Sequence, residues 1–286
     1  MVGHAVNHEM MACVLAARYD NVNQYVLANL SRGNCAMNDP TRRMFNQGVL
    51  GSLLTFSLLE SLFCRDAFAD EIKPVAAKWL AGLNELGKDV KNRKLTQIEW
   101  QQQVEQLMAQ VDLPDLMKFV QFDQLVGNLP MSDRGERSVS KRFPRVEGLP
   151  TDLVFGHQIF ALKKGRSVAP HGHNNMATAF LMLKGNCHGR HYDRVEDGDD
   201  FLIIRPTIDD KFGAGTYSTI SEHKDNIHWF KAESETAFIF NIHVLNLEAD
   251  VSRGGRIYVD PFGEKLSHGL VKAKTMSKKQ AYNKFG

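Results

Sequence analysis

The segment Gly165–Gly185 reads GRSVAPHGHNNMATAFLMLKG and is the most informative part of the chain. It places His171 and His173 two residues apart, between a glycine and an apolar run that another glycine closes. On a strand, side chains two residues apart point to the same face, so both imidazoles can approach one cation. His228, in the segment DNIHWFKA, can supply a third nitrogen. Three histidines that leave coordination positions open indicate a reactive metal site.

Short apolar segments separated by glycines and acidic turns follow one another from Leu153 onward, and no helical pattern interrupts them. Such a series predicts a mainly β fold, either a sandwich or a closed barrel. The expected strands cover residues 153–162, 177–183, 187–195, 201–206, 216–221, 226–232, 236–245 and 256–260.

Residues 70–128 have a helical pattern and predict an N-terminal α-helical segment. Thr96 and Glu99 form a capping box that opens a helix with Trp100 and Val104 on one stripe. Because its aromatic residues recur at helical spacing, we expect them to form a core rather than a ligand site. The helices should pack against the outer wall of the barrel or against its open end.

The remaining boundaries follow from composition. Residues 129–150 are rich in Ser, Arg, Gly and Pro and read as a linker or loop. The barrel is expected over residues 151–262. Residues 263–286 carry many lysines and few apolar residues, so we expect a mobile basic tail outside the barrel.

The spacing G-x5-H-x-H-x4-T-x6-G resembles the first signature of the cupin family, with Thr178 in place of the usual glutamate. Two longer blocks, HGHNNMATAFLMLKGNCHGRHYDRV and NIHWFKA, are similar to plant cysteine oxidases and cysteamine dioxygenases. This resemblance covers roughly residues 150–260. It implies a double-stranded β-helix, a jelly-roll barrel with a metal at one mouth.

By the same resemblance, His171, His173 and His228 are ligands of iron(II), Fe(2+), and the activity is that of a thiol dioxygenase. The substrates would be dioxygen and a small thiol or a cysteine-bearing peptide, and the product a sulfinic acid. Three histidines also suit zinc, manganese, nickel and copper. The alternative is a metal-binding cupin of another class, either an isomerase or lyase or a binding protein without turnover.

Further candidates surround the expected metal. Each ligand histidine needs a partner for its second ring nitrogen, and Asn241, Tyr192 and Asp193 are candidates for this role. His243, two residues after Asn241 on the same face, could contact the substrate or act as a base. His188 has a counterpart in the resembled family. It has opposite parity to His191, so only one of the two can face inward without a bulge.

The segment 37–69 has the features of a twin-arginine signal peptide. Arg42 and Arg43 precede an apolar stretch too short to span a bilayer comfortably, and Ala67-Phe68-Ala69 suits a cleavage site. Residues 1–36 are then an upstream extension that is possibly not translated. We therefore expect export by the twin-arginine machinery to the periplasm, with no membrane span after cleavage. A cytoplasmic location is the alternative if this signal does not function.

The bulk composition sets two further limits. A net charge of +2 and the absence of a basic stripe give no indication of nucleic-acid binding. The four cysteines show no zinc spacing, and only Cys187 falls within the barrel region. Cys187 should therefore be a buried, unpaired thiol.

Overall fold

The architecture was taken from a computed structural model that describes residues 79–140, 143, 150–251 and 255–286. All of these residues belong to one unit, Gly51–Gly286. The expected upstream extension (1–36) and signal peptide (37–69) lie outside the described residues, as do the start of the helical segment and most of residues 141–149.

Within the described residues, the segment before the barrel is helical, as its periodicity predicts. It contains α5 (Ala81–Lys91), α6 (Gln97–Met108), α7 (Leu113–Phe119) and α8 (Phe122–Val126). Helix α6 begins with the predicted capping box, in which Thr96 and Glu99 bond reciprocally. The predicted aromatic core is confirmed, because Trp79, Trp100 and Phe119 are buried. No helix among the described residues is both long and apolar enough to span a membrane.

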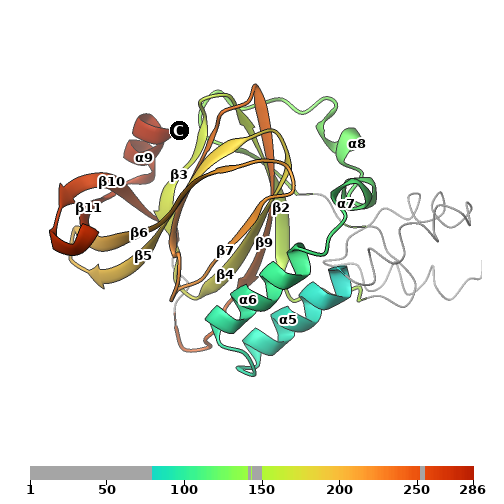
Figure 1. Cartoon of the computed structure of the whole chain (residues 1–286), viewed down its shortest axis with the longest axis horizontal. Coiled ribbons are helices and arrows are strands. Elements are labelled where there is room, and N and C mark those ends of the chain that lie inside the picture. Colours follow the sequence, from blue (N-terminus) through green and yellow to red (C-terminus); the bar gives the residue numbers. More distant parts are fainter. Residues whose placement is uncertain (1–78, 141–142, 144–149, 252–254) are drawn as a thin grey trace, which may run out of the picture. The chain divides into compact units, whose positions relative to one another are not determined.

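The strands form two antiparallel groups (Figure 1). The five-stranded sheet has the order β1-β2-β9-β4-β7, and the other group closes into a ring in the order β10-β11-β6-β5-β8-β3. The sheet comprises β1 (Arg137–Val139), β2 (Gly156–Lys163), β4 (Met176–Lys184), β7 (Tyr217–Ile220) and β9 (Thr236–Leu245). The ring comprises β3 (Ser167–Gly172), β5 (Cys187–Asp197), β6 (Phe201–Phe212), β8 (Ile227–Ala232), β10 (Ile257–Lys265) and β11 (Val271–Met276).

Strands from β2 to β9 alternate between the two groups as the chain advances, with β5 and β6 adjacent in the ring. This alternation is that of a double-stranded β-helix, so the predicted cupin-type fold is confirmed.

Strand β4 shows how the layers pack. Ala179 and Leu181 face the core shared with the helices, whereas Phe180 and Met182 face the barrel interior. Because both faces of β4 are buried, its sequence is a continuous apolar run rather than an alternating one. Helix α6 contacts β4 and β7, so the helices cover the outer wall of the barrel (Figure 1).

The prediction of a mobile basic tail over residues 263–286 is wrong. Strand β11 pairs with β10 and β6, and helix α9 (Lys278–Phe285) packs against β3. Val271 and Ala273 face the core, while Lys272 and Lys274 face outward. Strand β11 therefore buries one face and exposes the other, and the overall composition of the segment does not reveal this alternation.

The loop expected over residues 129–150 also has structure. It contains β1, which pairs with β2, and the buried Phe143, whose ring lies 3.9 Å from that of His157.

Candidate metal centre

The three predicted ligand histidines lie together inside the barrel. His171 is on β3, His173 follows the glycine that ends this strand, and His228 faces His171 across the β3–β8 pairing. One ligand nitrogen from each residue lies within 4.8 Å of the others. Two nitrogens bound to one cation at about 2.0–2.1 Å each are at most about 4 Å apart. Small side-chain rotations would therefore bring the three nitrogens close enough to bind one cation.

The hydrogen bonds of two ligands select the nitrogen that can bind a metal. The Nδ1–H of His171 donates to the carbonyl of Ala169 at 2.7 Å, and that of His228 to the carbonyl of Asn226 at 3.2 Å. In a neutral imidazole this leaves the Nε2 lone pair for coordination. Burial first, and neighbouring histidines second, hold the pKa of both rings well below the ordinary value. The donor set therefore fits a divalent metal.

Asn226 links two of the ligands and was not among the predicted site residues. Its Nδ2 donates to the carbonyls of His173 at 2.7 Å and Ser221 at 3.0 Å, while its own carbonyl accepts from His228. A Cβ at Gly172 would lie 2.4 Å from Asn226 Oδ1, so the residue between the two histidines must be glycine. The signal for this role was its place in the NIHWFKA block.

A cavity of about 220 Å³ lies beside the three histidines and between the two groups of strands. Asn241 and His243 line it from β9, which confirms that they share the inward face, and their side chains bond at 3.0 Å. Thr178 Oγ1 is buried and has no partner among the described residues. The lining comprises Gln158, Phe160, His171, His173, Met176, Thr178, His228, Asn241, His243, Leu245, Gly255 and Arg256.

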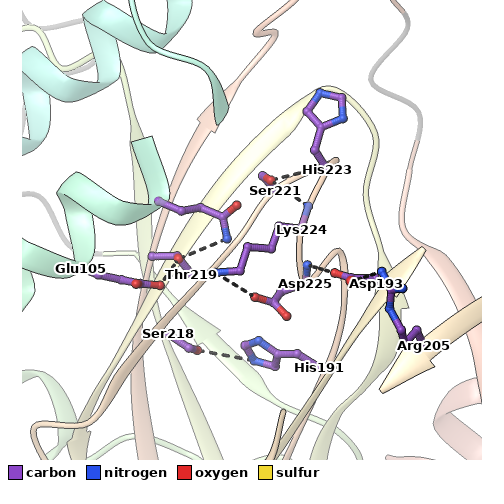
Figure 2. Close-up of polar contacts among 11 residues, drawn as sticks. Glu105, His191, Asp193, Arg205, Ser218, Thr219, Ser221, His223, Lys224 and Asp225 are labelled. Carbon is purple, nitrogen blue, oxygen red and sulfur yellow. Dashed lines mark hydrogen bonds and ion pairs between the residues drawn. The ribbon is translucent and has the colours of Figure 1, made fainter. Parts of the chain in front are cut away.

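The other predicted candidates do not line this cavity. His188 lies on another part of the surface, where it bonds Asp209. Tyr192 packs in a separate apolar cluster with Leu202 and Ile204. Asp193 contacts the loop before His228 rather than a ligand, because its Oδ1 accepts from the Asp225 amide at 2.9 Å (Figure 2).

His191, not His188, is the inward-facing histidine of β5. It pairs with His228 across β5 and β8, is fully buried, and has Ser218 3.5 Å from its Nε2 (Figure 2). Burial, and secondarily Lys224, lowers the pKa of His191 to about 3, so its ring is neutral. The parity argument allowed one of the two histidines to face inward, and this histidine is His191.

Comparison with known proteins adds little to this description. No protein-family profile matches the chain, and no curated protein matches it. Among solved structures, the chain is similar to a Klebsiella pneumoniae protein with a double-stranded β-helix domain, with TM-score 0.30, 12% identity and coverage of 47% of this chain and 87% of that one.

Two further solved structures are similar at the same level. For TT1209 of Thermus thermophilus, the TM-score is 0.30 and the identity 13%, over 43% of this chain and 93% of that one. For procruciferin, an 11S globulin of Brassica napus, the values are 0.28 and 14%, over 37% and 23%. The chain thus spans less than a quarter of that globulin.

Proposed function

We propose that this chain is a non-haem iron(II) dioxygenase that oxidises a small thiol to its sulfinic acid. The balanced reaction is R–SH + O2 → R–SO2H, in which sulfur loses the four electrons that dioxygen gains. No external reductant is needed. The observation that carries the proposal is a site of three imidazoles inside the barrel, two of them buried, with no carboxylate among the described residues that line the cavity.

The charge of the site favours a thiol as the ligand that completes it. Three neutral donors would leave the full positive charge of a divalent cation in a buried place, and a thiolate compensates part of it. When bound, iron(II) would supply deprotonation of the thiol and activation of dioxygen. Thr178, where cupins usually carry a glutamate, keeps this part of the wall uncharged.

The cavity residues position the substrate and limit its size. A volume of 220 Å³ corresponds to about seven water molecules of about 30 Å³ each, which suits a molecule of few heavy atoms. Phe160, Met176 and Leu245 provide apolar wall and displace water from it. Asn241 and His243 offer hydrogen-bonding groups on rigid strand positions.

The test is oxygen uptake by protein loaded with one equivalent of iron(II), with cysteine, cysteamine, 3-mercaptopropionate and a peptide with N-terminal cysteine. We expect one dioxygen consumed per sulfinate, with both atoms of labelled dioxygen in the product by mass spectrometry. His228→Gln should abolish uptake, whereas His188→Gln, a histidine outside the cavity, should retain it.

No uptake with any thiol by the fully loaded protein would overturn the proposal and favour an isomerase, lyase or binding protein. Metal analysis of protein purified without nickel gives an independent check. Stoichiometric zinc or manganese in place of iron would count against dioxygen chemistry.

We also propose that the protein is exported to the periplasm by the twin-arginine machinery, on the strength of residues 37–69. This machinery carries folded proteins, so a metal could be bound before export. A fusion of residues 37–75 to a folded fluorescent reporter should place the reporter in the periplasm. Replacing Arg42 and Arg43 by lysine should keep it in the cytoplasm, and retention of the unaltered fusion there would overturn the proposal.

A further inference from the structure

One permanent charge lies on the wall of the metal cavity. Among the described residues that line it, Arg256 alone carries a charge at every physiological pH. Its Cζ lies 5.9 Å from the ring centre of Phe160, another lining residue, and its side chain is 25% exposed. A ligand in the cavity therefore meets a partly desolvated guanidinium, which interacts with charge more strongly than one in water.

Two residues from distant parts of the chain hold this guanidinium in place. Its Nη1 donates to Glu136 Oε1 at 2.8 Å and to the Tyr282 hydroxyl at 2.9 Å. Tyr282 in turn donates to Glu136 Oε2 at 2.8 Å. Burial, and the Glu136 carboxylate after it, raises the pKa of Tyr282, so the phenol keeps the proton that it donates.

The hydrogen bonds of Arg256 determine which guanidinium nitrogens remain for a ligand in the cavity. Within the described part of the chain, every hydrogen bond of Arg256 leaves from Nη1. Glu136 is 8% exposed and does not line the cavity. Glu136 thus holds the guanidinium through Nη1, and the remaining donors, Nε and Nη2, can form the two parallel bonds by which arginine binds a carboxylate.

We infer that the substrate carries a carboxylate and that Arg256 binds it while the thiol lies at the three histidines. This inference rests on the proposed function and names its substrate class: short thiol carboxylates rather than amino thiols. An ammonium group in the same cavity would face both the guanidinium and the bound cation, and would be repelled by each.

The test measures binding rather than turnover. Zinc-loaded protein, freed of excess metal and kept without oxygen, is titrated calorimetrically with 3-mercaptopropionate and with cysteamine, thiols of similar length and opposite charge. A charge-assisted pair with arginine should make 3-mercaptopropionate bind at least about tenfold more tightly. Equal affinities, tighter binding of cysteamine, or no binding of either thiol would overturn the inference.

Two variants test whether Arg256 causes the tighter binding of 3-mercaptopropionate. Arg256→Gln combined with Glu136→Gln removes both charges, so no unpaired carboxylate is left buried. This double variant should lower the preference at least about tenfold and leave only the part that the bound cation supplies. Arg137→Gln, an exposed arginine next to Glu136, removes the same charge outside the cavity and should retain it. An undiminished preference in the folded double variant would overturn the inference.

The single variant Glu136→Gln should change the affinity for 3-mercaptopropionate in the opposite direction. Glu136→Gln leaves the charge of Arg256 uncompensated and should tighten 3-mercaptopropionate binding, whereas weaker binding by folded protein would contradict the inference. Because zinc and the absence of oxygen prevent turnover, these results do not depend on whether the iron-loaded protein oxidises thiols.

Discussion

Asn226→Ala tests whether the link between His173 and His228 shapes the metal centre. The change removes two buried hydrogen bonds, of 2.7 and 3.0 Å, from a side chain that is 1% exposed. At about 1 kcal/mol each, their loss should lower the free energy of unfolding of the metal-free protein by about 2 kcal/mol. For a unit of this size that corresponds to a fall in Tm of about 4–8 °C.

The effect on the metal should be separate from the effect on stability. Removal of a group that orients a ligand weakens metal binding by about 10- to 100-fold. Zinc affinity is measured by competition with a chromophoric chelator, and stability by thermal unfolding without metal. Asn84→Ala is the matched control, because this buried asparagine accepts one hydrogen bond at 3.0 Å from the amide of Val154, away from the site. If Asn226→Ala binds zinc as tightly as the unaltered protein, the bridging role assigned to Asn226 is wrong.

Three further predictions use other features of the barrel. Gly172→Ala places a methyl group 2.4 Å from Asn226 Oδ1, and denaturant unfolding should show a loss of about 1–3 kcal/mol. His191 has a folded-state pKa of about 3, below the ordinary 6.5. Its contribution to stability is complete above about pH 6.5 and is lost as the pH falls toward 3. His191→Gln should therefore reduce the drop in denaturation midpoint between pH 7 and pH 4.5, and an unchanged drop would refute this. Burial first, then Glu233, raises the pKa of Cys187 to about 12, so peptide mass spectrometry should find it unalkylated at pH 8 until the chain unfolds.

Local patterns predicted much of the fold. The capping box at Thr96, the apolar run of β4 and the shared face of Asn241 and His243 depend on residues close in sequence, and all three were confirmed. The meeting of His228 with the other two histidines was also predicted, because strand parity and the two sequence blocks agreed. The burial of Cys187 followed from how often unpaired cysteine side chains are buried.

The features that the sequence did not predict depend on contacts that local sequence patterns do not encode. Arg256 is positioned by Glu136 and Tyr282, which lie 120 and 26 residues away, in segments expected to be a loop and a mobile tail. Lysines on the outward face of β11 concealed its inward alternation. Asn226 bonds to backbone carbonyls, which every residue carries, so the sequence contains no pattern that predicts these contacts. The signal peptide over residues 37–69 stays a prediction, since it lies outside the described residues.

The closed ring of strands has a consequence for how the chain is made. Its last two members, β10 and β11, pair with β3 and β6, which are synthesised long before them. Until β10 and β11 have been synthesised, β3 and β6 each present an unpaired backbone edge, and such edges are templates for aggregation. A nascent chain halted before residue 256 should therefore depend on chaperones, and the pocket wall at His171, whose partner on β10 is Tyr258, can mature only after translation is nearly complete.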